Sequence, residues 1–126
     1  MRNRQKAQGS RSERVGDLLI EFVSRLLTRS LEDPRLRSVT LTGVDVRSDL
    51  KHARIYFTVR DGAASKDEAL AGLRAAAGFI RGRIAADLKL RYVPAIEFVY
   101  DEAPDRARRI DDLLKAVPPK EYGRQS

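Results

Sequence analysis

The stretch RAAAGFIRGRI, Arg74 to Ile84, places two glycines in a segment whose apolar residues otherwise recur at helical spacing. Each glycine costs a helix interior about 1 kcal/mol relative to alanine. The apolar spacing from Leu70 to Leu88 runs through both, which is typical of one long helix that uses small residues for close packing. At 1.5 Å per residue, such a helix of about 24 residues is roughly 36 Å long, more than a three-stranded sheet covers. We therefore expect a break at Gly78.

The sequence before this stretch begins with a helical pattern. Apolar residues recur at spacings of three and four over residues 12–31, and Ser10 and Glu13 have the spacing of a capping box. Asp33-Pro34 should end this helix, because a proline pushes the preceding residue out of the α region. The pattern predicts a helix over residues 12–31.

Two strand patterns follow that helix. Residues 38–46 alternate apolar with polar, and Gly43 shifts the alternation by one position, which indicates a β-bulge. Residues 53–60 alternate strictly, and the short loop between the two segments predicts an antiparallel pair. Ser65 and Glu68 then form a second capping-box pattern at the start of the glycine-containing helical segment. Residues 92–100 read as a third strand, and residues 105–117 as a terminal helix.

The predicted fold is α+β with the order α-β-β-α-α-β and a three-stranded mixed sheet. Residues 53–60 and 92–100 are joined through helical segments, so the right-handed crossover preference makes them parallel. The first strand lies antiparallel beside them. All helices then cover one face of the sheet, and the opposite face carries Arg54, Tyr56 and Arg60.

Length and composition set the domain organisation. The chain has 126 residues, 42% of them hydrophobic, which suits one domain over residues 11–117 with polar tails at 1–10 and 118–126. Cysteine is absent, which excludes disulfides and zinc fingers. No apolar run approaches about 20 residues, so we expect a cytoplasmic protein that is neither exported nor membrane-anchored.

The formal net charge of +7 is concentrated in two places. Residues 1–14 carry five cationic side chains against one carboxylate, and residues 72–91 carry the same surplus of four. Nineteen of the 25 basic residues are arginine, whose guanidinium binds phosphate in a bidentate manner. Such a balance usually indicates a polyanionic partner, although codon bias explains an arginine excess equally well.

Five motifs in the same order carry a family resemblance. They are EDPRL (32–36), SDLKHARIYFTV (48–59), AAGFIRGRI (76–84), LRYVPAIEFVYD (90–101) and ARRIDDLL (107–114). Together they span most of the chain, which resembles the ribosome-binding factor A family of bacterial small-subunit assembly factors.

The resemblance implies a type II KH-like domain. RNA-binding KH domains clamp the nucleic-acid backbone with a GxxG loop between two helices. In the family that this chain resembles, an Ala-x-Gly kink takes the place of that loop, and Ala76-Ala77-Gly78 matches it. The resemblance further implies binding to the free 30S subunit or its precursor and to 16S rRNA, with a role in late 30S maturation, 16S rRNA processing and cold adaptation. No cofactor is implied, and we expect a monomer.

Candidate RNA contacts are basic residues and the kink itself. A helix beginning at Gly78 would present unpaired N–H groups to a phosphate, and nearby guanidinium groups would add charge. Arg54 and Arg60 share a predicted strand face with Tyr56, a mixture that can stack a base. The alternative for the cations around the kink is a solvated helix face, and the alternative for Arg54 and Arg60 is simple exposure. The candidates are Arg74, Ala76, Gly78, Arg81, Arg83, Lys89, Arg91, Arg54 and Arg60.

No catalytic residues and no metal site are predicted, so we expect a protein that is not an enzyme. His52 is the single histidine and has no cysteine to share a metal. Three alternatives stay open: a general KH-like RNA-binding or ribosomal protein, a small RNA-processing enzyme using Asp45, Asp49 and Asp101, and a protein-interaction module using the open sheet face.

Overall fold

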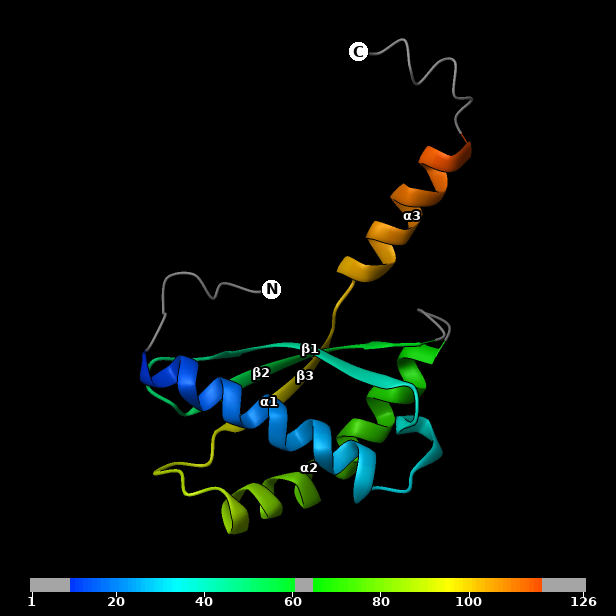
Figure 1. Cartoon of the computed structure of the whole chain (residues 1–126). Helices are drawn as coiled ribbons and strands as arrows, with labels where there is room; N and C mark the ends of the chain where they lie inside the picture. Colours follow the sequence, from blue (N-terminus) through cyan, green and yellow to red (C-terminus); the bar gives the residue numbers. More distant parts are fainter. Residues whose placement is uncertain (1–9, 61–64, 117–126) are drawn as a thin grey trace.

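The computed structural model describes residues 10–60 and 65–116 (Figure 1). Apart from Ser10, the tails predicted at 1–10 and 118–126 lie outside the described residues. In chain order the elements are α1 (Arg11–Arg29), the 3₁₀ helix η1 (Pro34–Leu36), β1 (Val39–Val46), β2 (His52–Val59), α2 (Lys66–Asp87), β3 (Ala95–Tyr100) and α3 (Ala103–Ala116).

The three strands form one mixed sheet in the order β1-β2-β3. β1 pairs antiparallel with β2, and the register shifts between Leu41 and Gly43, which confirms the predicted bulge. β2 pairs parallel with β3, with His52 opposite Ala95. The predicted α+β class, sheet composition and strand directions are therefore confirmed.

The core lies between this sheet and the helices α1 and α2, which lie on one side of it (Figure 1). Strict alternation in β2 sends Ile55 and Phe57 into the core, where both are completely buried. α1 contributes Leu19 and α2 contributes Leu73 and Ile80 from positions spaced as one helix face. Burial of each such side chain contributes about 1.5–3 kcal/mol relative to exposure.

α1 begins as predicted and ends earlier than predicted. The Ser10 hydroxyl accepts a hydrogen bond from the backbone N–H of Glu13 at 3.1 Å, so the cap at this end is confirmed. The helix ends at Arg29 rather than at residue 31, with Ser30 as its C-cap. Asp33-Pro34 does not end it but opens η1, in which Asp33 Oδ1 accepts from the N–H of Arg35 at 2.9 Å. Proline suits this place because its fixed φ favours the first turn of a helix.

α2 is one helix where two were expected. It runs from Lys66 to Asp87 without interruption, and its ribbon changes direction part-way along (Figure 1). The bend lets a long helix follow the sheet without ending, so the expected second helix N-terminus at Gly78 is wrong. The capping box predicted at its start is also wrong, because the Ser65 side chain makes no capping hydrogen bond.

α3 does not cover the sheet. It projects away from the rest of the domain (Figure 1), and none of its residues is buried. Its stripe of Ile110, Leu113 and Leu114 is exposed, which corrects the expectation that every helix packs on one sheet face. The hydroxyl of Tyr100 at the end of β3 donates to Asp105, which ties the first turn of α3 to the sheet.

Candidate nucleic-acid interface

The outward side of α2 carries a row of small residues from Ala71 to Ala85. Ala71, Ala75, Gly78, Gly82 and Ala85 are all exposed, and their spacing of three or four places them on one helix face. A Cβ atom built at Gly78 or Gly82 would have no heavy atom within 4 Å. Close packing inside the protein therefore does not explain either glycine, and the surface above both is open to a partner.

Arg74 and Arg81 lie together on one side of this small-residue face. Both side chains are exposed, and their spacing of seven residues places them on the same stripe of α2. The guanidinium of Arg81 donates to the carbonyl of Val93 over a long 3.4 Å. Arg74 has no hydrogen bond or ion pair to any residue within 10–60 or 65–116. Both guanidinium groups thus keep donors for an anion.

Arg83 lies on the other side of the small-residue face and is engaged within its own helix. Its Nε and one terminal nitrogen donate to Asp87 Oδ2 at 3.1 and 2.9 Å. The guanidinium also lies 5.8 Å from the ring centroid of Phe79. The carboxylate offsets much of its charge, so Arg83 is a less favourable candidate for a phosphate contact than Arg74 or Arg81.

Lys89 and Arg91 extend the basic surface into the loop between α2 and β3. Both are exposed, and neither forms an ion pair with another described residue. The Arg91 guanidinium lies 5.7 Å from the ring centroid of Tyr92. Arg74, Arg81, Lys89 and Arg91 therefore form a basic surface that follows α2 into this loop.

Two arginines that the sequence analysis did not name lie close to Arg83. Arg25 and Arg29, near the end of α1, line a hollow of about 190 Å³ together with Arg83. Arg25 also pairs with Glu21 at 3.5 Å, whereas Arg29 has no ion pair among the residues described. The sequence predicts that Arg25 and Arg29 share one face of α1, because they are four residues apart. It does not predict that this face lies beside α2, because that depends on tertiary packing.

Ala76 and Gly78 have different environments, although both were predicted as contacts. Ala76 is buried in the core and is only 8% exposed, so little of its side chain is accessible to RNA. Gly78 is exposed. The N–H groups expected to be free there belong to an uninterrupted helix, so a phosphate-binding helix N-terminus at this point is not formed.

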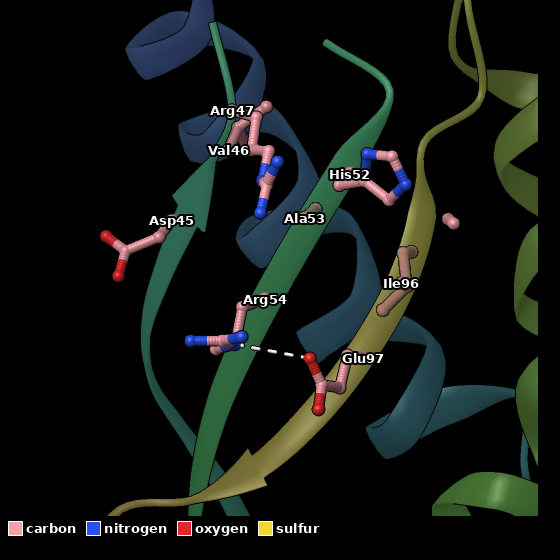
Figure 2. Close-up of a pocket in the computed structure, with 9 residues that line it drawn as sticks. Asp45, Val46, Arg47, His52, Ala53, Arg54, Ile96 and Glu97 are labelled. Atoms are coloured by element: carbon pink, nitrogen blue, oxygen red, sulfur yellow. Dashed lines mark hydrogen bonds and ion pairs between the residues drawn. The ribbon is translucent and has the colours of Figure 1, made fainter. Parts of the chain in front are cut away.

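The open face of the sheet is not a basic surface. Figure 2 shows Arg54 turned toward Glu97 on β3, and its Nε donates to Glu97 Oε1 at 3.2 Å. Asp45 is the register partner of Arg54 on β1. Hydrogen bonds from Arg54 to Tyr56 and to Glu97, together with the Glu97 charge, raise the pKa of the guanidinium. Carboxylates on both neighbouring strands thus offset the charge of Arg54, which makes it a weaker candidate for a phosphate contact than Arg74 or Arg81.

The aromatic residue of that face is covered. Tyr56 is only 8% exposed, and its hydroxyl donates to Asp45 Oδ2 at 3.2 Å, so it cannot stack a base. Arg60 directly follows Val59, the last residue of β2, and one of its terminal nitrogens donates to the carbonyl of Arg37 at 3.5 Å. Arg54 therefore lies beside Tyr56 as expected, but the ring of Tyr56 is covered and Arg60 lies apart from both.

The carboxylates that an RNA-processing enzyme would use are held in separate places. They are Asp45, Asp49 and Asp101. Asp101 is buried and accepts from the Thr42 hydroxyl at 2.8 Å, while Asp49 accepts from the N–H of Lys51 in the β1–β2 turn. Among residues 10–60 and 65–116, no three metal-binding side chains group together. None of the helices in these ranges is long and apolar enough to cross a membrane.

A sequence profile described as ribosome-binding factor A matches residues 11–114, which is more than half of the chain. The chain belongs to the ribosome-binding factor A family. A ribosome-binding factor A from Geobacter metallireducens is 43% identical over 113 residues, covering 90% of this chain and 96% of the relative. One from Trichlorobacter lovleyi is 47% identical over 107 residues, covering 85% and 87%.

Solved structures of ribosome-binding factor A share the fold. The crystal structure from Thermus thermophilus aligns with a TM-score of 0.65 and 23% identity, over 73% of this chain and 97% of that one. A Thermus thermophilus homology model, fitted into a cryo-EM map of a 30S complex of that protein, aligns at 0.58 with 24% identity, over 69% and 91%. The KH-like fold predicted from the five motifs is confirmed.

Proposed function

We propose that this chain binds the free 30S ribosomal subunit or its precursor through 16S rRNA and acts as a non-enzymatic assembly factor. Late 30S maturation, 16S rRNA processing, a role in cold adaptation and a cytoplasmic location follow from the family and form part of the proposal. The supporting observation is a near full-length match to relatives named ribosome-binding factor A. A homology model of the Thermus thermophilus protein of that name, which shares the fold, has been fitted into a cryo-EM map of its 30S complex.

The basic side of α2 is the surface that we assign to the RNA. Small side chains along α2 let a sugar–phosphate backbone approach the helix closely. Arg74 and Arg81 on one side, and Lys89 and Arg91 beyond the helix, then neutralise phosphates. Contacts of this kind fix position on a folded RNA and make binding depend on salt.

Co-sedimentation with purified 30S subunits tests the function. The wild-type protein should pellet with the subunit, and Arg74→Glu with Arg81→Glu should reduce the bound fraction strongly at moderate salt. Both residues are exposed, so circular dichroism should show an unchanged fold. Arg106→Glu with Arg109→Glu on α3 is the control of equal charge and should retain binding.

RNA recovered with the protein from cell extract separates the alternatives. A 30S assembly factor should recover 16S rRNA and its precursors and run with small-subunit particles on a sucrose gradient. Recovery of many unrelated transcripts would indicate a general RNA-binding protein. Cleavage of labelled 16S rRNA that is lost in Asp49→Asn would indicate an enzyme.

A further inference from the structure

Tyr92 is an exposed aromatic ring on the basic side of the molecule. It lies in the loop between α2 and β3 and is 45% exposed. Phe79 is also exposed, but the guanidinium near its ring belongs to Arg83, which Asp87 already holds. Of these two exposed rings, Tyr92 is therefore the one whose neighbouring cations are still available to an anion.

Two cations from different parts of the chain lie against the Tyr92 ring. The Nζ atom of Lys51, from the β1–β2 turn, lies 5.9 Å from the ring centroid, and the guanidinium carbon of Arg91 lies 5.7 Å from it. Neither side chain has an ion pair among the residues that the structure describes. Asp49, the nearby carboxylate of the turn, accepts from the backbone N–H of Lys51 instead.

The backbone holds Lys51 beside the ring. The β1–β2 turn is closed by a hydrogen bond from the N–H of Leu50 to the carbonyl of Arg47 at 2.8 Å. Leu50 has a φ of 65°, a left-handed conformation that is uncommon for a branched residue. The carbonyl of Lys51 then accepts from the N–H of Ala95 at 2.9 Å, which fixes the turn against the start of β3.

An aromatic ring flanked by free cations matches the chemistry of one unpaired nucleotide. A base stacks on the ring with little regard to its identity, and the cations contact the phosphates on either side. A base inside a duplex cannot offer its face in this way, so the nucleotide must be unstacked. On the premise that the chain binds ribosomal RNA, we propose that Tyr92, Lys51 and Arg91 hold one unpaired nucleotide of 16S rRNA.

Equilibrium binding of the full chain to 30S subunits, followed across salt concentrations, tests this site. Tyr92→Leu removes the ring and should weaken binding by about 5- to 150-fold, the equivalent of one stacked base. Tyr92→Phe keeps the ring and should bind within about twofold of the wild type. Lys51→Met should lower the slope of affinity against salt by about one contact. Ultraviolet crosslinking should attach a nucleotide to the peptide that contains Tyr92.

Each outcome decides a separate question. If the wild-type protein binds the subunit, the Leu and Phe variants bind with the same affinity as each other, and no crosslink forms on that peptide, the nucleotide site is overturned. The proposed function would then stay intact. Loss of binding in both variants would also overturn it, because a hydroxyl contact and not stacking would then be at work. Failure of the wild-type protein to bind the subunit would overturn the proposed function and this site with it.

Discussion

Arg83 and Asp87, one helical turn apart on α2, form a hydrogen-bonded ion pair with a nitrogen–oxygen distance of 2.9 Å. Both side chains are 41% exposed, so the pair contributes little to stability, about 0.3–0.5 kcal/mol. Its larger effect is electrostatic, because it holds a carboxylate near the end of α2, across the small-residue face from Arg74 and Arg81.

Asp87→Asn should therefore tighten binding to 30S subunits by a few-fold and steepen its salt dependence. The substitution releases Arg83 for a phosphate and removes a negative charge that repels RNA. Asp112→Asn on the projecting helix α3 makes the same change in net charge and should have little effect. Equal gains in both variants, measured by titration at two salt concentrations, would mean that only net charge matters.

Gly78→Ala should separate stability from binding. Nothing within 4 Å of the added methyl group opposes it, and alanine favours a helix over glycine by about 1 kcal/mol. Unfolding in urea should thus show a more stable protein. The same methyl stands on the surface where an RNA backbone would approach, so 30S binding should weaken. A variant that gains stability and binds normally would remove Gly78 from the interface.

Gly72 is the matched position at which a methyl group should not help. A Cβ there would lie 3.0 Å from Leu36 Cδ2 and 3.1 Å from Arg35 Cβ, because α2 packs closely against η1. The gain in helix propensity is offset by this crowding, so Gly72→Ala should be less stable than Gly78→Ala in the same urea experiment. A larger gain at position 72 would contradict the close packing of η1.

Truncation to alanine should cost very different amounts of stability at two leucines. Leu73 is completely buried under the sheet, whereas Leu113 on α3 is 64% exposed. Leu73→Ala should cost about 2–5 kcal/mol of the free energy of unfolding, and Leu113→Ala should cost almost nothing. Thermal or chemical unfolding checks both, and a large loss for Leu113→Ala would show that α3 packs against the domain in solution.

Ionisation of Tyr100 should lower the free energy of unfolding at high pH. Burial raises its pKa above the ordinary value of 10.0, and the hydrogen bond that it donates to Asp105 raises it further. Between the two pKa values the folded state keeps a proton that the unfolded state loses. The contribution of protonated Tyr100 to the free energy of unfolding is therefore complete below about pH 10 and is lost as the pH rises through the pKa of the folded state. Tyr100→Phe should lack this loss. Absorbance titration should also lose a late tyrosinate component in that variant.

The sequence predicted the sheet well because strand signals are local. Alternation set the faces of β2, and the phase shift at Gly43 marked the bulge that the structure shows. The i,i+4 spacing of Arg83 and Asp87 is likewise a local signal that is sufficient to predict their ion pair.

The remaining errors concern long-range packing. A helix stripe such as Ile110 to Leu114 indicates amphipathic character but not what the stripe faces, and α3 leaves it in solvent. Alternation placed Tyr56 on the face opposite the helices, yet its bond to Asp45 and its neighbours on that face cover it. The length of the helical pattern relative to a three-stranded sheet predicted an end to the helix at Gly78, but a long helix can bend without ending.

The parallel pairing of β2 with β3 sets the order in which a nascent chain becomes a folded one. The β1–β2 hairpin can form from adjacent residues, but β3 cannot join before α2 and the loop after it have been synthesised. Until then the outer edge of β2 exposes unpaired N–H and C=O groups, which are a template for aggregation. A chain cut short before Ala95 would therefore be a substrate for chaperones and proteases rather than a smaller working domain.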